Sequence, residues 1–452
     1  MSQLIAGVAR ANITPPVGML MSGYGSRTDP AIGIHDDLNT VVIYLNDSEM
    51  EAALVTTDLI SISAEGTARV REACNAASGV PAENIMVAFA HSHGGPQTDL
   101  HHSRSTDDEL KKAYGTVIVQ KIAGALTEAK RNAVPVRMGL GRQDCYFGKN
   151  RREHKPDGTI TLGFNPDGPT SPIVDVIRLD RLDTGDPLSL IFSYACHGTA
   201  LRGGNLFYTA EFSGLAKSFV DNQFPTAMSA FIAFCSADID PWPHSDSDFE
   251  KCERYGRQLG CAVTHAALDI EDTIEDIRLA VASQDFRLQL EKQPLLEEAK
   301  ERLERAQAAA DKELAEKPEG EKSLHWSTER AVSGAEELVK ALESGETDFG
   351  VSGEIQALAM DDCAIVGLPG EIFVKIGLEI VEKSPFPRTI AIAHTNGSIG
   401  YVPTADQVPL GGYEVDRAMA SRYGIPIAPQ SDQVMVEVAL VALHKCYDSL
   451  QG

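Results

Sequence analysis

The amino-acid sequence predicts an α/β protein: a layered, mixed β-sheet core with flanking helices and an inserted helical hairpin. Over the first ~290 residues, short apolar runs alternate with longer amphipathic segments, which is the pattern of an α/β domain. From residue 288 to residue 345 the pattern changes to apolar residues at heptad spacing within a run dense in Glu, Lys and Arg. At 452 residues the chain can bury a large core, in one elaborated domain or in two.

The N-terminal part supplies the first strands and helices. Residues 41–45 and 53–57 are predicted as neighbouring strands, and residues 64–77 and 108–131 as helices, the second of them long and amphipathic. Residues 147–172 are rich in Gly, Pro, Asn, Asp and Arg and show little periodicity. This segment is therefore predicted to be either a solvated connection or a loop that contacts substrate. One apolar helix, 433–450, is expected at the end of the chain.

Residues 288–345 are predicted to form an antiparallel helical hairpin, inserted into a main domain made of residues 1–287 and 346–452. Pro318 and Gly320 separate its two helical patterns. We favour an arm that packs on the body or on another subunit, which would give a homo-oligomer, over a lid that covers substrate. The apolar residues of its seam are Leu296, Ala299, Leu303, Ala306 and Ala310, then Ala331, Ala335, Leu338 and Leu342.

The composition narrows the range of partners. With 65 acidic and 40 basic residues the formal charge is -25, which argues against nucleic acid and acidic membrane surfaces as main partners. The partner that we expect is a small-molecule substrate. The chain begins without a signal-peptide pattern, and no run approaches ~20 apolar residues, so no transmembrane segment is predicted. The eight cysteines include no C-x-x-C pair and are interpreted as reduced thiols. These features predict a cytoplasmic protein.

The stretch His91-Ser92-His93-Gly94-Gly95-Pro96 is the most informative in the chain. An apolar run, residues 85–90, predicts a buried strand that ends on the two imidazoles. Neutral imidazole is a common ligand of divalent transition metals, and the glycines after it let the backbone approach a ligand closely. The motif alone leaves two interpretations open, a metal site or two histidines that merely end a strand.

Four further apolar runs also end on polar groups. Because open α/β sheets bind ligands beyond the carboxyl ends of their strands, these groups predict one shared site. Residues 188–196 lead to His197, 230–234 to Asp238 and Asp240, 363–369 to Glu371, and 389–393 towards Tyr401.

Short motifs occur in a characteristic order along the chain. They are GVARANITPP at 7–16 with GY at 23–24, HSHGGP at 91–96, NR at 150–151, ACHGT at 195–199, PGEIF at 369–373, YVPT at 401–404 and GYE at 412–414. Together they span nearly the whole chain apart from the helical insertion. In content and order they resemble the motifs of the neutral/alkaline, non-lysosomal ceramidase family.

This resemblance implies the catalytic N-terminal domain of that family, with a single bound Zn²⁺. Carried over position by position, the zinc ligands are His91, His197, Glu371 and Tyr401, and Arg151 matches a position tied to activity. The C-terminal immunoglobulin-like domain of the family is expected to be absent, because the few residues beyond Tyr413 look helical.

The chain also departs from the family's motifs. Where the family has Gly-Asp-Val-Ser-Pro with a serine tied to catalysis, this chain has Ala237-Asp238-Ile239-Asp240-Pro241, and Asn12 stands where Asp is usual. A carboxylate cannot replace a hydroxyl as an acyl-accepting nucleophile without changing the intermediate, which argues against serine-type chemistry at this position. Because the chain lacks a signal-peptide pattern and is strongly acidic, we expect a cytosolic relative that uses the same metal on a smaller, soluble amide or ester.

Several candidate residues keep two possible roles. His93 is interpreted as a general acid or base for the substrate, or as a group that only orients others. Asp240 is a candidate general base or a polar holder, and Asp238 a residue that braces the loop. Tyr401 could ligate the metal as phenolate or donate to an oxyanion, and Arg151 could bind a substrate oxygen or form an ordinary salt bridge.

Three hypotheses about function follow. The first is a zinc-dependent hydrolase in which metal-activated water attacks an amide or ester. The second keeps the metal but makes the enzyme a lactonase, or an isomerase or lyase for a small polyol or hydroxy acid. A non-catalytic metal-binding protein ranks last, because structural zinc sites favour cysteine.

The remaining histidines are interpreted as surface or structural residues. Among them, His101 and His102 are the reserve ligands. The others are His154, His244, His265, His325, His394 and His444.

Overall fold

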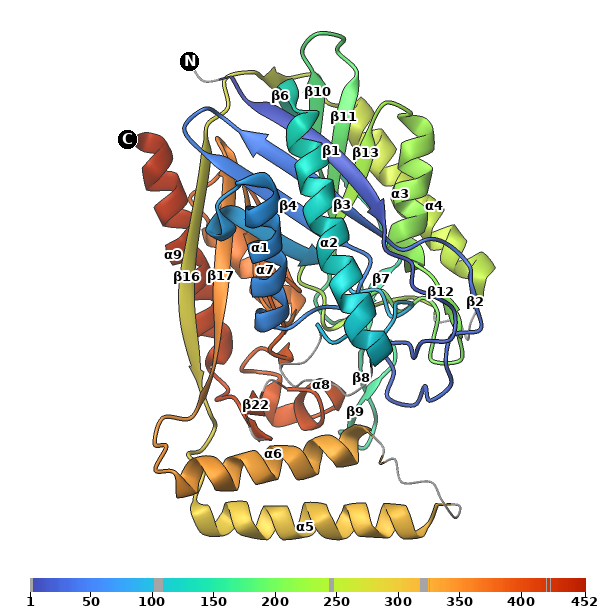
Figure 1. The fold of residues 1–452 in the computed structure, drawn as a ribbon, viewed down its shortest axis with the longest axis vertical. Coiled ribbons are helices and arrows are strands. Elements are labelled where there is room, and N and C mark those ends of the chain that lie inside the picture. The colour runs from blue at the N-terminus through green and yellow to red at the C-terminus, as the bar shows by residue number, and fades with distance from the viewer. Residues whose placement is uncertain are drawn as a thin grey trace.

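Two β-sheets lie against each other, and helices cover the outer face of each, so the core has four layers (Figure 1). The structure is a computed structural model that describes residues 3–100, 109–243, 248–317, 324, 326–419, 421–422 and 424–452. The layered α/β fold expected from the sequence is confirmed. None of the helices in these ranges is long and apolar enough to cross a membrane.

The larger sheet has the strand order β13-β11-β10-β6-β1-β3-β4-β5, with β15 beside β6. This sheet is buried on both faces, as strand β3 illustrates. Val42 and Tyr44 face the helices, whereas Val41 and Ile43 face the second sheet. The pairing of β3 with β4 confirms the two neighbouring strands predicted there. The strands are β1 (Ile5–Asn12), β3 (Asn39–Asn46), β4 (Glu51–Thr57), β5 (Ile85–Phe89), β6 (Val134–Asp144), β10 (Ile173–Arg181), β11 (Pro187–Tyr194), β13 (Met228–Ala233) and β15 (Thr273–Ile274).

Four helices cover the outer face of the larger sheet: α1 (Ala64–Ser78), α2 (Glu109–Arg131), α3 (Glu211–Gln223) and α4 (Phe249–Leu268). Helices α1 and α2 lie over the half that ends in β5, and α3 and α4 over the half that ends in β13. Helix α1 begins where the Ser63 side chain accepts a hydrogen bond from the Gly66 amide, and it ends at Gly79 in the left-handed region.

The smaller sheet has the order β16-β17-β18-β20. Its outer face is covered by α7 (Val374–Lys383) and α9 (Ser431–Gln451), and α9 is the C-terminal helix expected from the sequence. The strands are β16 (Leu279–Gln289), β17 (Gly350–Met360), β18 (Cys363–Gly367) and β20 (Arg388–Ile392).

Helices α5 (Leu296–Ala315) and α6 (Trp326–Glu343) follow β16 and precede β17 in the chain. They run antiparallel, side by side (Figure 1). The seam is buried at Ala299, Ala310, Ala335 and Leu338, as the heptad spacing predicts. Ala331 is exposed, so the apolar contact of α6 begins one turn later than expected. Pro318 and Gly320 lie outside the described residues.

The segment 147–172 is not a purely solvated connection. It contains β7 (Gly148–Asn150), β8 (Arg152–His154) and β9 (Ile160–Leu162). Asn150, Arg151 and Arg152 are only 2–4% exposed. Of the two alternatives offered by the sequence, the solvated connection is wrong at this point, because buried carboxylates from distant segments hold both guanidinium groups.

The strand ends that carry the candidate site meet for a reason that differs from the predicted one. Strands β5 and β13 are the two edges of the larger sheet, and the alternation of pairings makes them run in opposite directions. Each step along a sheet adds a twist of roughly 20–25°. Over seven steps the accumulated twist therefore nearly reverses the direction of one edge strand relative to the other. The chain at the end of β20 then bridges both edges: the Phe89 amide donates to the His394 carbonyl and the Ala393 amide to the Ala233 carbonyl. One common carboxyl edge of an open sheet was therefore the wrong explanation, although the strand ends do converge.

Candidate metal centre

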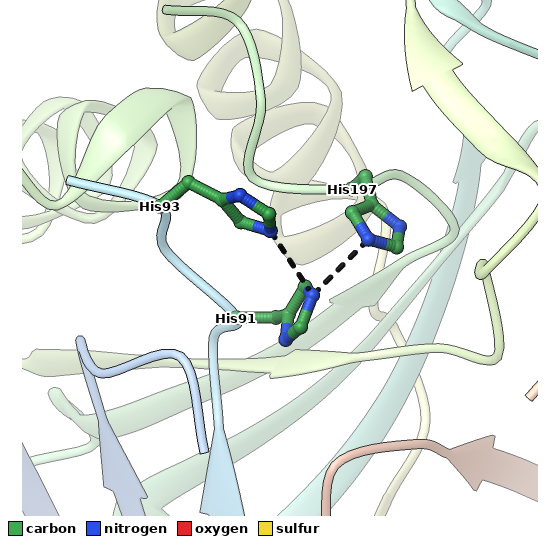
Figure 2. Close-up of side chains that lie close together, drawn as sticks. All are labelled: His91, His93 and His197. Atoms are coloured by element: carbon green, nitrogen blue, oxygen red, sulfur yellow. Dashed lines mark hydrogen bonds between the residues drawn. The ribbon is translucent and has the colours of Figure 1, made fainter. Parts of the chain in front are cut away.

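Three imidazole rings meet beyond the ends of β5 and β11 (Figure 2). His91 follows β5 with a positive φ of 55°, His93 comes two residues later, and His197 follows β11. The Nε2 atom of His91 lies 3.1 Å from Nε2 of His197 and 3.2 Å from Nε2 of His93. All three side chains are buried.

The tautomers of two of these rings favour a bound cation. Nδ1 of His91 lies 2.9 Å from the Ile60 carbonyl, and Nδ1 of His197 lies 3.1 Å from the Ser236 carbonyl. A carbonyl oxygen only accepts, so in each neutral ring Nδ1 carries the proton and Nε2 presents a lone pair. Two lone pairs 3.1 Å apart repel each other, and a metal ion between them removes that repulsion. The pair therefore fits a divalent cation.

Glu371 brings a carboxylate to the same pair. It lies on β19 (Glu371–Ile372), which pairs in parallel with β21 (Tyr401–Val402), so that Glu371 stands opposite Tyr401. Its Oε2 is 3.1 Å from Nε2 of His197 and 3.5 Å from Nε2 of His91, and it accepts no hydrogen bond from the described residues. Burial raises the pKa of Glu371, but the imidazoles of His91 and His197 outweigh it and hold the pKa well below its usual range. Glu371 is therefore an ionised donor.

Two donor sets share the His91–His197 pair. With His93, three imidazole nitrogens lie within 4.8 Å of one another; with Glu371, the set has two imidazoles and a carboxylate. Nδ1 of His93 has no hydrogen-bond partner among the described residues, so neither tautomer of that ring is enforced. Its Nε2 can thus ligate a cation or carry a proton towards the centre.

The N-terminal segment holds His93 in place. The Arg27 guanidinium donates to the His93 carbonyl at 2.9 Å, and the Tyr24 ring packs edge-on against the imidazole with 4.9 Å between centroids. Gly23 has φ of 100°, and a Cβ there would lie 2.5 Å from Nδ1 of His93. Only glycine combines this backbone conformation with such a close approach.

Arg151 connects two of the sequence-predicted groups, Tyr401 and Asp240, to each other and to Glu414. Its guanidinium donates from Nη2 to the Tyr401 hydroxyl at 3.0 Å, from Nη1 to Asp240 at 3.0 Å and from Nε to Glu414 at 2.9 Å. The Tyr401 hydroxyl oxygen in turn lies 3.4 Å from Nε2 of His197. Of the two roles expected for Arg151, the structure shows the salt bridge. Glu414 belongs to a matched motif, but the sequence assigned it no role.

Tyr401 and Asp240 occupy defined places in this network. Burial, and then the charge of Glu371, raise the pKa of Tyr401, which favours the protonated phenol. Asp240 lies on β14 (Ile239–Pro241), and its Oδ1 accepts from Arg151 and, at 3.0 Å, from the Thr199 hydroxyl. This geometry matches the polar holder among the two roles expected for Asp240.

Asp238, a candidate from the sequence, and two further aspartates hold the surrounding loops. Asp238 accepts hydrogen bonds from the Asn150 side chain at 3.0 Å and from the Val374 amide at 2.8 Å. Asp58 pairs with Lys217, and Asp36 accepts from the Ala210 amide at the start of α3. None of the three approaches the histidine group through a contact that the structure describes. The reserve ligands His101 and His102 lie outside the described residues, as do His244 and His325.

His394 is a residue of the site that the sequence interpretation missed. Its ring stacks on His91 with 3.8 Å between centroids and 11° between planes, it is 1% exposed, and its φ is 51°. Neither ring nitrogen has a hydrogen-bond partner among the described residues. Burial, and then His91, hold the pKa of His394 well below its usual range, so the ring is neutral. The available signal was its place at the end of the apolar run 389–393, the same pattern that identified His91.

Removing the His394 ring is expected to weaken metal binding. His394→Ala leaves a gap beside His91, and changes to groups that orient a ligand cost about 10–100-fold in metal affinity. His394→Phe keeps a flat ring at this position and should stay within a few-fold of wild type. Titration of the metal-depleted proteins against a competing chelator gives both affinities. An alanine variant with wild-type affinity would contradict the role.

Glu211 fixes the loop that follows His197. Its buried carboxylate accepts hydrogen bonds from the Ala200 amide at 3.0 Å and the Leu201 amide at 2.8 Å. Burial raises the pKa of Glu211 to about 7 despite these bonds. Glu211, the first residue of α3, thereby holds the backbone a few residues after the candidate ligand His197.

Glu211→Gln is expected to change how stability depends on pH. Because the folded pKa of about 7 lies above the unfolded value of 4.5, the folded protein binds this proton more tightly, and wild type loses stability as pH rises through that window. Glutamine does not titrate. Urea denaturation at pH 5 and at pH 8 gives the free energy of unfolding of both proteins. Relative to wild type, the variant should therefore be more stable at pH 8 than it is at pH 5. If wild type and variant differed in stability by the same amount at both pH values, the proposed titration of Glu211 would be ruled out.

Fold and site together define an α/β protein with a buried histidine and carboxylate centre suited to a divalent metal. The family model for the N-terminal domain of neutral/alkaline non-lysosomal ceramidase matches residues 4–239. The chain belongs to this family of hydrolases, which confirms the resemblance.

Solved structures of the family share the fold. Neutral ceramidase from Pseudomonas aeruginosa superposes with a TM-score of 0.72 at 17% identity, over 99% of this chain and 75% of that one. A ceramidase complexed with C2 gives a TM-score of 0.72 at 16% identity, over 99% of this chain and 76% of the other. The structural match therefore extends over Glu371 and Tyr401, which lie beyond the family-model match.

Proposed function

We propose that this protein is a zinc-dependent hydrolase that cleaves an amide or ester bond of a small, soluble substrate. The observation that carries the proposal is the His91–His197 pair, whose Nε2 atoms face each other at 3.1 Å while both Nδ1 atoms contact carbonyl oxygens. Glu371 adds a carboxylate whose Oε2 atom is buried and accepts no hydrogen bond from the described residues. Nitrogen and oxygen donors without cysteine are typical of catalytic rather than structural zinc.

The residues of this chain divide the remaining tasks. When bound, a zinc ion supplies Lewis acidity and makes a water molecule acidic enough to attack at neutral pH. Tyr401 keeps its phenol proton and donates it as a hydrogen bond to the oxygen on which negative charge develops. Arg151 holds that phenol through its 3.0 Å contact. His93, which burial keeps neutral by lowering its pKa, would accept a proton at Nε2 from the attacking water and pass that proton to the leaving group.

Asp240 is a positioning residue in this proposal. Its Oδ1 already accepts hydrogen bonds from Arg151 and Thr199, which keeps the carboxylate directed at the network. It stands in place of a catalytic serine, and we propose that no acyl group is transferred to this position.

The choice of substrate and compartment rests on composition. The relatives are named for ceramide hydrolysis, which is cleavage of an N-acyl amide. A charge of -25 disfavours work at an anionic membrane surface, so we propose a small soluble amide or ester. All eight cysteines are free thiols, seven of them buried, which suits the reducing cytoplasm. The hairpin α5–α6 remains our proposed surface for homo-oligomerisation.

One experiment tests the reaction class. Purified protein is analysed for metal and screened against short N-acyl amides, lactams, lactones and esters in ¹⁸O-labelled water. We expect about one zinc per chain, loss of turnover on chelation, and solvent oxygen in the product. Solvent oxygen absent from the product would indicate isomerisation or elimination instead. Metal content well below one per chain, or hydrolysis undiminished after chelation, would contradict the proposal.

A further inference from the structure

Arg202 lies on the loop that follows His197, and the structure leaves most of its hydrogen-bonding capacity unused. Its side chain is 24% exposed, and its guanidinium has one ion pair, from Nη2 to Asp240 Oδ2 at 3.5 Å. The guanidinium makes no hydrogen bond to the described part of the chain. Arg151 offers the contrast, because all three of its nitrogens donate to protein acceptors. A guanidinium carries five N–H donors in a planar fork, so Arg202 can still bind an anion.

Arg202 is connected to the candidate metal centre through two series of contacts. In the first, Asp240 links it to Arg151, which holds the hydroxyl of Tyr401. In the second, the carbonyl of the preceding residue, Leu201, accepts a hydrogen bond from the Tyr24 hydroxyl at 3.1 Å, and the Tyr24 ring packs against His93. The partly exposed guanidinium is therefore a neighbour of the histidine group rather than an isolated surface charge.

The ion-pair network around Arg202 has a surplus of positive charge. Among the ion pairs between described residues, the three guanidiniums of Arg151, Arg152 and Arg202 face the two carboxylates of Asp240 and Glu414. The rest of the protein is strongly acidic, with a net charge of -25. Its general field repels an anionic substrate, so a local surplus of guanidinium charge is needed to bind one. Arg202 is the partly exposed member of the network and is placed to supply that charge.

We propose that Arg202 binds a carboxylate of the substrate, so that the preferred substrates are small amides or esters of the N-acyl amino acid type. This inference rests on the proposed hydrolase function. The metal would hold the scissile carbonyl while Arg202 receives a carboxylate a few bonds away. A planar guanidinium matches the two oxygens of a carboxylate, whereas an uncharged lipid headgroup offers it no such partner. Arg202 is thus a specificity-determining residue.

Paired hydroxamic acids test this without a known substrate. Butyryl hydroxamate presents only a metal-binding group, whereas malonyl, succinyl, glutaryl and adipoyl monohydroxamates add a carboxylate at increasing distance. Binding to the zinc-loaded protein is measured by calorimetry. At least one carboxylate-bearing compound is expected to bind about 10–100-fold more tightly than butyryl hydroxamate, the gain of a charge-assisted hydrogen bond.

Arg202→Met is expected to remove that gain and leave the affinity for butyryl hydroxamate unchanged. Arg257→Met, an exposed arginine on α4, is the matched control for a lost positive charge and should preserve the gain. The inference is overturned if every chain length binds wild type no better than butyryl hydroxamate, or if the gain survives in Arg202→Met. It is also overturned if Arg202→Met weakens both kinds of ligand equally, because Arg202 would then serve only to hold Asp240. If no hydroxamate binds wild type, the metal centre itself is wrong, and that failure is distinct from the others.

Discussion

His91→Ala is expected to abolish metal binding and turnover together. The Nε2 atom of His91 lies within 3.5 Å of donor atoms of His93, His197 and Glu371, so this side chain belongs to both candidate donor sets. Loss of a group that only orients a ligand already costs about 10–100-fold in metal affinity, so loss of the ligand should cost more than 100-fold. Metal per chain after desalting, and hydrolysis of the best screened substrate, measure the two effects.

His265→Ala is the matched control. This histidine lies on the exposed side of α4, where its one ion-pair partner among the described residues is Asp269 at 3.3 Å. The variant should keep the metal and wild-type turnover. An His91→Ala protein that folds and retains one metal per chain would contradict the assignment of this residue.

Arg151→Met is expected to lower both stability and turnover. The substitution leaves Asp240 and Glu414 buried with one guanidinium fewer, and breaking a buried ion pair in this way costs about 3–5 kcal/mol. It also removes the donor that holds the Tyr401 hydroxyl, so kcat should fall more than KM rises. Urea denaturation gives the free energy of unfolding, and steady-state kinetics give kcat and KM separately.

Two further variants separate charge from geometry at this position. Arg151→Lys restores the charge but not the three directed N–H groups, so stability should recover in part while kcat stays low. Arg257→Met removes an exposed arginine, 3.6 Å from Glu253, whose ion pair is worth about 0–1 kcal/mol. If Arg151→Met were no less stable than Arg257→Met, the buried network would not have the structural importance argued here.

Local patterns in the sequence were enough to predict most of the fold. The continuous apolar run of β3 and the heptad spacing of α5 each report a burial pattern that needs no knowledge of distant segments. The candidate ligands were found because strand ends carry polar groups, and because the order of motifs resembles a family that the comparison confirms.

Other features depend on packing between distant segments, which no local pattern contains. The pairing order and twist of the larger sheet decide that the ends of β5 and β13 meet, whereas periodicity reports only which faces of a strand are buried. Arg151 looked like part of a polar loop, because its partner Glu414 is 263 residues away. His394 and Arg202 lack a motif of their own, and only their neighbours in space give them a role.

The position of a bound metal tests the central claim most directly. Crystals of the zinc-loaded protein, with data collected on both sides of the zinc absorption edge, locate the ion by anomalous scattering. The account predicts one strong peak about 2.0–2.2 Å from Nε2 of His91, from Nε2 of His197 and from an oxygen of Glu371. A fully loaded protein whose zinc lies away from the His91–His197 pair would contradict it.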